Sequence, residues 1–135
     1  MGIFLKNVQD FVKSTEQLEH KVVREIMEEI IEMPVMLSPI KTGNFVSNWL
    51  LGLDGNTPWG VNGLKNPDKE ARVNLLIGQI PQDAANHTYN LVNNTGYAIP
   101  LEEGHSGQAP AGMLGVTKLH IPTIVRRILK NNGVT

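Results

Sequence analysis

The sequence predicts an α+β fold with a long N-terminal helix, a small, mainly antiparallel β-sheet, a short middle helix and a C-terminal helix. Three observations predict it. Apolar residues recur every three or four positions through the first third of the chain, residues 49–53 and 87–93 alternate as strands do, and residues 122–129 return to helical spacing. The length suits one domain, 1–135, with the long helix over 1–33 and the α+β core over 34–135.

Two apolar stripes define the N-terminal helix, and they merge after Val22. The first stripe comprises Phe4, Val8, Phe11, Leu18, Val22, Ile26 and Ile30, and the second comprises Leu5, Val12, Val23, Met27 and Ile31. Pro34 is expected to end the helix, which would then span about 30 residues or ~45 Å. A small domain cannot easily cover such a helix. We therefore expect either a break near Ser14-Thr15 or a neighbouring subunit that covers part of it, around Val22 to Ile31.

Local signals predict the remaining elements. In order they are a helical turn over 43–47 capped by Thr42, a strand over 49–53, a loop over 57–67, a helix after an Asn66 cap that ends at Pro81, a strand over 87–93, a short helical segment over 97–103, a loop over 106–112, a strand over 113–116, and a final helix with Pro122 in its first turn.

Composition excludes several classes of protein. The chain has no cysteine, which excludes disulfides, thiolate metal sites and cysteine nucleophiles. Twelve basic and 13 acidic residues give a net charge of -1, unlike a dedicated nucleic-acid binder. The absence of cysteine fits synthesis in a reducing cytosol. The N-terminus lacks a signal-peptide pattern and no apolar run is long enough to span a bilayer, so we expect no membrane partner.

Residues with catalytic or metal-binding chemistry are few and scattered. The four histidines, at 20, 87, 105 and 120, show no metal-ligand spacing. His105 follows Glu102 and Glu103, which is compatible with acid–base chemistry, but the sequence offers no accompanying nucleophile or oxyanion donor. The glycines at 104 and 107 resemble a phosphate loop without its lysine. We therefore expect no catalytic, cofactor or metal site.

Three motifs occur in order along the chain. The first is Ser38-Pro39-Ile40-Lys41-Thr42-Gly43-Asn44-Phe45 with Asn48-Trp49; the second is Asn93-Asn94 with Tyr97-Ala98, Leu101-Glu102 and Gly104; the third is Ser106, Gln108-Ala109-Pro110 and Gly112-Met113. Together they resemble the small neck and tail-completion proteins, or head–tail connectors, of tailed bacteriophages. The resemblance covers residues 34–129 and is weakest over 55–85. Lys41 stands where that family commonly has an acidic residue, so no charge-mediated role of this turn is carried over.

The resemblance implies a structural virion protein of the head–tail neck rather than an enzyme, made in the bacterial host cytoplasm. It further implies a homo-oligomeric ring, by family expectation a hexamer, that contacts head-closure, tail-terminator or tail-tube proteins around a channel for genomic DNA. The motif residues expected to serve the fold or assembly are Thr42, Gly43, Trp49, Tyr97, Glu102, Gly104, Gln108, Pro110, Gly112 and Met113. Among them, the stretch from Tyr97 to Met113 is the expected assembly surface.

Two alternatives remain open from sequence. The first is a nucleic-acid-binding accessory protein that uses the C-terminal basic cluster Arg126, Arg127 and Lys130. The second is a small hydrolase that uses His105 with Glu102.

Overall fold

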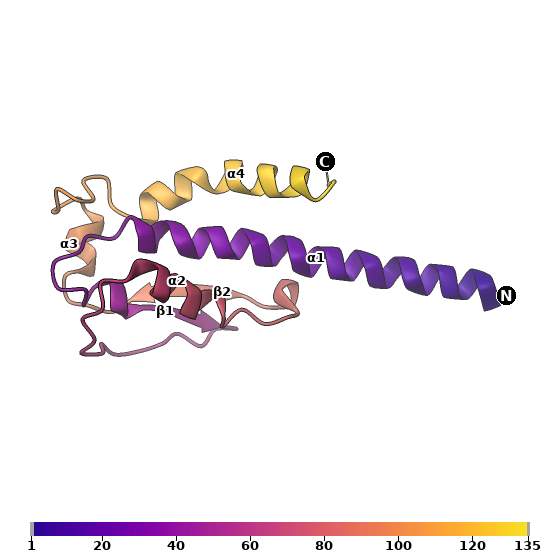
Figure 1. Cartoon of the computed structure of the whole chain (residues 1–135), viewed down its shortest axis with the longest axis horizontal. Helices are drawn as coiled ribbons and strands as arrows, with labels where there is room; N and C mark the ends of the chain where they lie inside the picture. Colours follow the sequence, from indigo (N-terminus) through magenta and orange to yellow (C-terminus); the bar gives the residue numbers. More distant parts are fainter. Residues whose placement is uncertain (1, 135) are drawn as a thin grey trace.

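One long helix, α1 (Gly2–Met36), runs along most of the length of the molecule, and α3 with its flanking loops lies beyond its C-terminal end (Figure 1). The computed structural model describes residues 2–134, with side chains from residue 5 onward, so the predicted contribution of Phe4 lies outside the described side chains. The other elements are the 3-10 turn η1 (Val46–Asn48), β1 (Trp49–Leu53), α2 (Lys69–Ile77), the 3-10 turn η2 (Ala84–Asn86), β2 (Tyr89–Asn93), α3 (Ala98–Glu102) and α4 (Leu114–Asn131). The predicted α+β class is confirmed.

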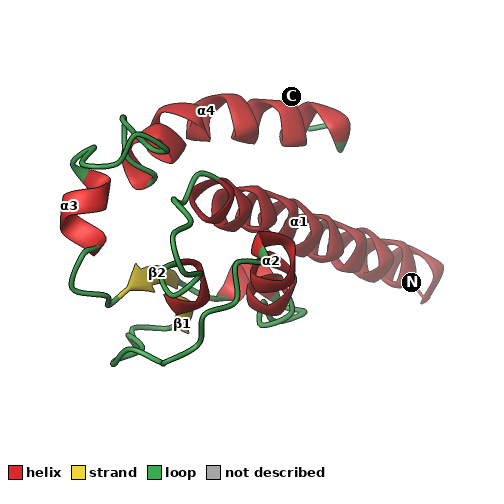
Figure 2. Ribbon diagram, turned by 60° about the vertical axis from the view of Figure 1, so that its left-hand side comes forward, coloured by secondary structure: helices red, strands yellow, loops and turns green. Residues whose placement is uncertain are grey.

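The elements form three layers, with α1 in the middle. In both Figure 1 and Figure 2, α4 lies on one side of α1, whereas α2 and the two-stranded sheet lie on the other. β1 pairs antiparallel with β2 from Trp49 opposite Asn93 to Leu53 opposite Tyr89. The central helix α1 therefore packs against other elements on two opposite faces.

The main core lies between the C-terminal half of α1, α2 and the sheet. Its most buried side chains include Ile31, Val35, Trp49, Leu76 and Met113. A smaller cluster joins the other face of α1 to α4 through Val22, Ile124 and Ile128. The sequence prediction that α1 becomes more buried after Val22 is confirmed. The chain itself buries Val22 and Ile31 and half-buries residues 23–30, so the uncovered part of α1 lies before residue 20, earlier than the stretch around 22–31 for which a neighbouring subunit was expected.

The N-terminal half of α1 extends beyond the rest of the molecule (Figure 1). Residues 5–19 are all exposed, and the first half-buried residue is His20, whose Nδ1 accepts a hydrogen bond from the Ala85 N–H at 3.2 Å. The helix does not break near Ser14-Thr15; Thr15 Oγ1 donates to the Phe11 carbonyl at 2.9 Å within a continuous helix.

Proline positions account for two errors in the sequence prediction. α1 continues past Pro34 to Met36, because a proline in the last turn removes a single N–H donor and the next bond, from Leu37 N–H to Met33 O at 3.0 Å, still forms. The segment 113–116 is not a strand. α4 begins at Leu114, so Pro122 lies inside the helix and not in its first turn, and its side chain is exposed.

Smaller corrections concern helix ends. Asp68, not Asn66, caps α2, with its carboxylate accepting from the Ala71 N–H at 3.0 Å, and α2 ends at Ile77 before Gly78 and not at Pro81. The expected helical turn over 43–47 is an irregular turn followed by η1. Among residues 2–134, no helix has both the length and the apolar content needed to cross a membrane.

Candidate assembly surface

The first motif connects the end of α1 to the start of β1. The Trp49 indole, 2% exposed, donates from Nε1 to Ser38 Oγ at 2.8 Å, and that hydroxyl donates to the Pro34 carbonyl at 2.7 Å. Phe45 packs edge-on against Trp49 with ring centroids 5.6 Å apart. Ser38 thus satisfies both a buried indole and a carbonyl near the end of α1, so Trp49 serves the fold and is not available to a partner.

Gly43 allows the turn of this motif to approach the long loop before α2. Its φ is +83°, and a Cβ atom there would lie 2.6 Å from the backbone of both Asn66 and Pro67. Thr42 is exposed, and its Oγ1 accepts from the Asn44 N–H at 3.3 Å, a local turn bond in place of the expected helix cap.

An asparagine network holds the 57–67 loop against the core, and the sequence interpretation did not identify it. Asn44 Nδ2 donates to the carbonyls of Asn62 and Leu64 at 3.2 and 3.0 Å, and the Tyr97 hydroxyl donates to Asn44 Oδ1 at 2.6 Å. The fully buried Asn48 accepts from the Asn62 N–H at 2.8 Å. Ten of the thirteen asparagines fall between residues 44 and 94, and this concentration is the sequence signal for side chains that bind loop backbone.

Glu102 caps helix α4 from the end of α3. Its Oε1 accepts from the N–H groups of Met113 at 3.0 Å and Leu114 at 2.7 Å, and its Oε2 accepts from Gly115 at 3.0 Å. These donors are otherwise unpaired at a helix N-terminus, where a negative charge is also favoured. Burial raises the pKa of the Glu102 carboxyl, but the three backbone donors outweigh it and hold the pKa below its usual value.

The glycines of the second and third motifs permit this arrangement. Gly112 has φ of +79°, and a Cβ there would lie 2.3 Å from the Glu102 carbonyl oxygen and 2.5 Å from its Oε2. Gly104 has φ of +89°, and a Cβ there would lie 2.5 Å from the Pro110 carbonyl oxygen. Both positions therefore require glycine to bring the loop over 103–112 back onto α3.

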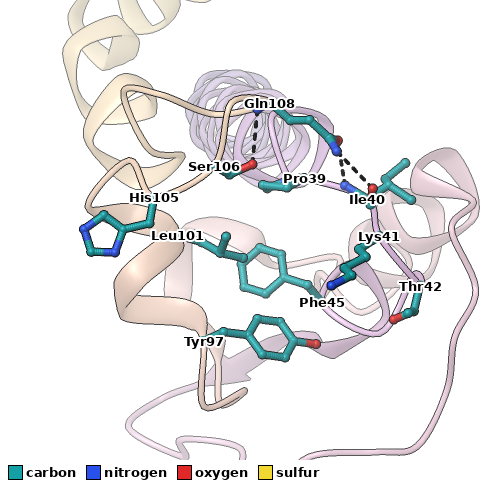
Figure 3. A pocket seen from close by; sticks show the side chains of 10 residues that line it. All are labelled: Pro39, Ile40, Lys41, Thr42, Phe45, Tyr97, Leu101, His105, Ser106 and Gln108. Carbon is teal, nitrogen blue, oxygen red and sulfur yellow. Dashed lines mark hydrogen bonds between the residues drawn. The ribbon is translucent and has the colours of Figure 1, made fainter.

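Gln108 binds this loop to the first motif. The Ile40 N–H donates to Gln108 Oε1 at 2.9 Å, and Gln108 Nε2 donates to the Ile40 carbonyl at 3.1 Å, as Figure 3 shows. The Gln108 amide thus pairs with both the backbone N–H and the backbone carbonyl of Ile40, as a neighbouring β-strand would. The structure thus brings the three motifs together at the end of the molecule where α1 terminates.

Met113 does not lie on an assembly surface. Its side chain is 1% exposed and belongs to the main core. The expectation of an apolar Met contact with a partner at this position is wrong, since Met113, the N-cap residue of α4, packs within the core of its own chain. Other apolar residues of the same end remain uncovered: Tyr97 is 42% exposed, Ile99 71% and Leu114 44%.

A cavity of about 620 Å³ opens beside these residues, between the first motif and α3 (Figure 3). Its apolar walls come from Pro39, Ile40, Phe45, Tyr97 and Leu101. Its polar lining comes from Lys41, Thr42, His105, Ser106 and Gln108. We call this feature the end pocket. It contains no carboxylate, and Figure 3 shows the imidazole of His105 turned outward, away from Phe45 and Leu101.

The pair proposed for a hydrolase is not assembled. Both oxygens of Glu102 are used by α4, and among residues 2–134 no hydrogen bond joins His105 to it. No group of three or more His, Asp or Glu side chains within the described range could hold a metal ion. The basic cluster is also partly occupied, because the Arg127 guanidinium pairs with the Glu29 carboxylate, with Nη1 to Oε1 at 2.8 Å, and this pairing raises the pKa of Arg127.

His87 forms a cluster of ionisable side chains with Asp54 and Asp83 that the sequence motifs did not indicate. Its Nδ1 lies 2.6 Å from Asp54 Oδ2 and its Nε2 lies 2.9 Å from Asp83 Oδ1. Asp54, with φ of +54°, follows β1 directly, and its other oxygen accepts from the Thr88 N–H at 3.1 Å. Hydrogen bonds to both carboxylates raise the pKa of His87, and the same bonds lower the pKa of Asp54 and Asp83. The cluster links the residue that follows β1 to the segment that precedes β2, at one end of the sheet.

No family model matches the chain, and neither a curated protein nor a solved structure matches it.

Proposed function

We propose that this protein is a structural subunit of the head–tail neck of a tailed bacteriophage. In this role identical copies form a ring that joins head-closure components to the tail and leaves a channel for DNA. The observation that carries the proposal is the N-terminal half of α1, a continuous helix whose described apolar side chains, from Leu5 to Leu18, are exposed. Such a surface is stable in water only at a cost, and assembly with other copies removes that cost.

The roles of the motif residues support the same proposal. The residues that carry the resemblance to neck proteins hold backbone together: Trp49 and Ser38 at the end of α1, Glu102 at the start of α4, and Gln108 between the two loops. None of these three contacts presents a free reactive group. A set of residues that fixes one loop-rich end of a subunit suits a protein whose work is to be a rigid part of an assembly.

Electron microscopy of intact particles tests the location. A small tag fused to the C-terminus of the chain should add density, repeated around the particle axis, at the junction of head and tail. Particles that lack the chain should accumulate as separate filled heads and tails. A label on the capsid shell or at the tail tip, or normal particles without the chain, would contradict the proposal.

One observation favours a second candidate, binding to nucleic acid. The outward face of α4 carries Lys118, Arg126 and Lys130, all exposed, and the helix contains no acidic residue. In a ring this face could also line the DNA channel. Exchange of Arg126 and Lys130 for glutamine should then lower DNA affinity and reduce its dependence on salt by about one unit of slope per lysine or arginine. A salt slope unchanged by these substitutions excludes this face as a DNA contact.

A further inference from the structure

Two uncovered apolar surfaces lie at opposite ends of the molecule. The first, which we call the N-terminal stripe, consists of Leu5, Val8, Phe11, Val12 and Leu18, whose exposed fractions lie between 37% and 72%. The second is the end pocket with its neighbours Ile99 and Leu114. α1 separates them, since its N-terminal half carries the stripe and its C-terminal end lies beside the pocket (Figure 1).

The N-terminal stripe continues a face of α1 that already packs against a helix. Val22, Ile26 and Met33 of α1 contact α4 in the smaller core cluster. At about 100° per residue, Val8, Phe11 and Leu18 fall on this same side of α1, whereas Leu5 and Val12 lie toward Val23, which packs against the main core. α4 stops where the covered part ends, with Asn132 Nδ2 bound to Glu25 Oε2 at 3.0 Å. Beyond that point, over residues 5–19, this apolar face of the helix is exposed in the single chain.

The two surfaces differ in charge in a complementary way. One border of the N-terminal stripe carries Glu16 and Glu19, both exposed. On the opposite border, beside Leu18, the Lys21 Nζ lies 3.8 Å from Glu25 Oε1 and is paired within the chain. The ionisable residues that line the end pocket are Lys41 and His105, with no carboxylate among them. Two N-terminal stripes in contact would bring carboxylates together, and two end pockets in contact would bring Lys41 side chains together. The N-terminal stripe in the end pocket instead places opposite charges at the rim of an apolar contact.

We propose that the N-terminal stripe of one copy docks in the end pocket of a second copy, with Phe11 entering between Phe45, Tyr97 and Leu101 and with Glu16 and Glu19 facing Lys41. This inference rests on the self-association part of the proposed function and not on the location in a phage neck. Two different surfaces at opposite ends of one chain make a head-to-tail contact, which closes into a ring when the rotation between copies permits. Pairing of stripe with stripe would instead give a two-fold dimer and leave the pocket empty.

Cross-linking tests the geometry, because the chain has no cysteine of its own. Single variants Val12→Cys and Thr42→Cys, both exposed positions, are mixed and treated with a short bismaleimide. The proposal expects a cross-linked dimer in the mixture and none with either variant alone. In the double variant it expects a ladder that ends at the closed ring. Cross-linking of Val12→Cys alone would show stripe-to-stripe pairing and overturn the proposal.

Association measured by sedimentation tests the contacts. Phe11→Ala should weaken association by about 30-fold, as for an anchor at the centre of an interface, without changing the unfolding midpoint, because Phe11 is 72% exposed in the single chain. Lys41→Glu should weaken it roughly two- to five-fold, and Glu16→Lys in the same chain should recover most of that loss. Lys65→Glu, an exposed lysine outside the pocket, is the matched control.

The outcomes separate the two levels of proposal. Rings that form normally with Phe11→Ala and Lys41→Glu would overturn the stripe-to-pocket contact and leave the ring itself in place. A wild-type chain that stays monomeric at every concentration would overturn self-association, and the stripe-to-pocket contact with it. Association weakened by Phe11→Ala, rescued in the charge-exchanged double variant and cross-linked only in the mixture is the result that supports the contact.

Discussion

The two ends of this molecule are built on opposite principles. At the end where α1 terminates, side chains of three motifs bind backbone across the chain, as Glu102 does at α4, Gln108 at Ile40 and Ser38 beneath Trp49. At the other end, α1 extends alone, and residues 5–19 have no cover within the chain. An isolated helix of this length is only marginally stable in water. One end therefore holds the subunit together, whereas the other is a helix without a cover of other elements over residues 5–19.

The same distinction separates two kinds of apolar residue in one sequence. Trp49 and Phe11 are both aromatic, but Trp49 is 2% exposed and Phe11 is 72% exposed. Substitution should therefore act on folding at the first and on association at the second. The following predictions test this contrast, from the largest expected effect to the smallest.

Removal of the Trp49 side chain should have the largest effect on stability. Trp49→Ala removes a core side chain and leaves the Ser38 hydroxyl without its donor, so the free energy of unfolding should fall by about 3–5 kcal/mol. Urea denaturation followed by circular dichroism measures the change. Phe11→Ala in the same assay should change the free energy of unfolding of the monomer by less than about 0.5 kcal/mol. Equal losses from the two substitutions would remove the contrast between the ends.

Glu102→Gln should have an intermediate effect. The amide replaces a carboxylate that accepts three backbone N–H groups, so the loss should be about 1–3 kcal/mol at pH 7. Glu103→Gln, at the adjacent exposed position, is the control and should change little. Because the pKa of Glu102 is lowered from 4.5, its stabilisation is complete above that pH and is lost as pH falls through the lowered value. The wild-type advantage over Glu102→Gln should therefore shrink in acid; an advantage that is constant from pH 7 to pH 3 would contradict the capping role.

His87→Gln should have the smallest effect on stability. Unlike the contribution of Glu102, which is lost as pH falls, the contribution of His87 is lost as pH rises. The pKa of His87 is raised from 6.5, so its stabilisation is complete below pH 6.5 and is lost as pH rises through the raised value. The pKa values of Asp54 and Asp83 are lowered from 3.8, so their contribution is complete above pH 3.8 and is lost as pH falls further. The difference in urea midpoint between wild type and His87→Gln should thus be greatest between pH 3.8 and 6.5. His120→Gln is the control, and a flat difference from pH 4 to pH 9 would show that the cluster does not act as an ion pair.

Patterns that depend on neighbouring residues were predictable from the sequence. The helical spacing of α1 and the alternation of Trp49 to Leu53 follow from local physical chemistry, and the α+β class follows from them. Features that depend on distant residues were not predictable. α4 starts at Leu114 because a carboxylate twelve residues earlier caps it, and no local signal distinguishes that start from a strand. The motif residues were found as a set, but the burial of Met113 and the exposure of Ile99 are decided by how α3 and α4 turn relative to the core.

Amide hydrogen exchange over residues 5–18 tests the central claim most directly. The account predicts fast exchange in this stretch when the chain is diluted to the monomer, because the helix there has no tertiary contact. At assembling concentrations the same stretch should become protected, together with residues 97–108 of the end pocket, while residues 22–35 of α1 are protected in both states. Fast exchange over 5–18 in both states, or strong protection already in the monomer, would contradict the claim that this half of α1 is completed by another copy.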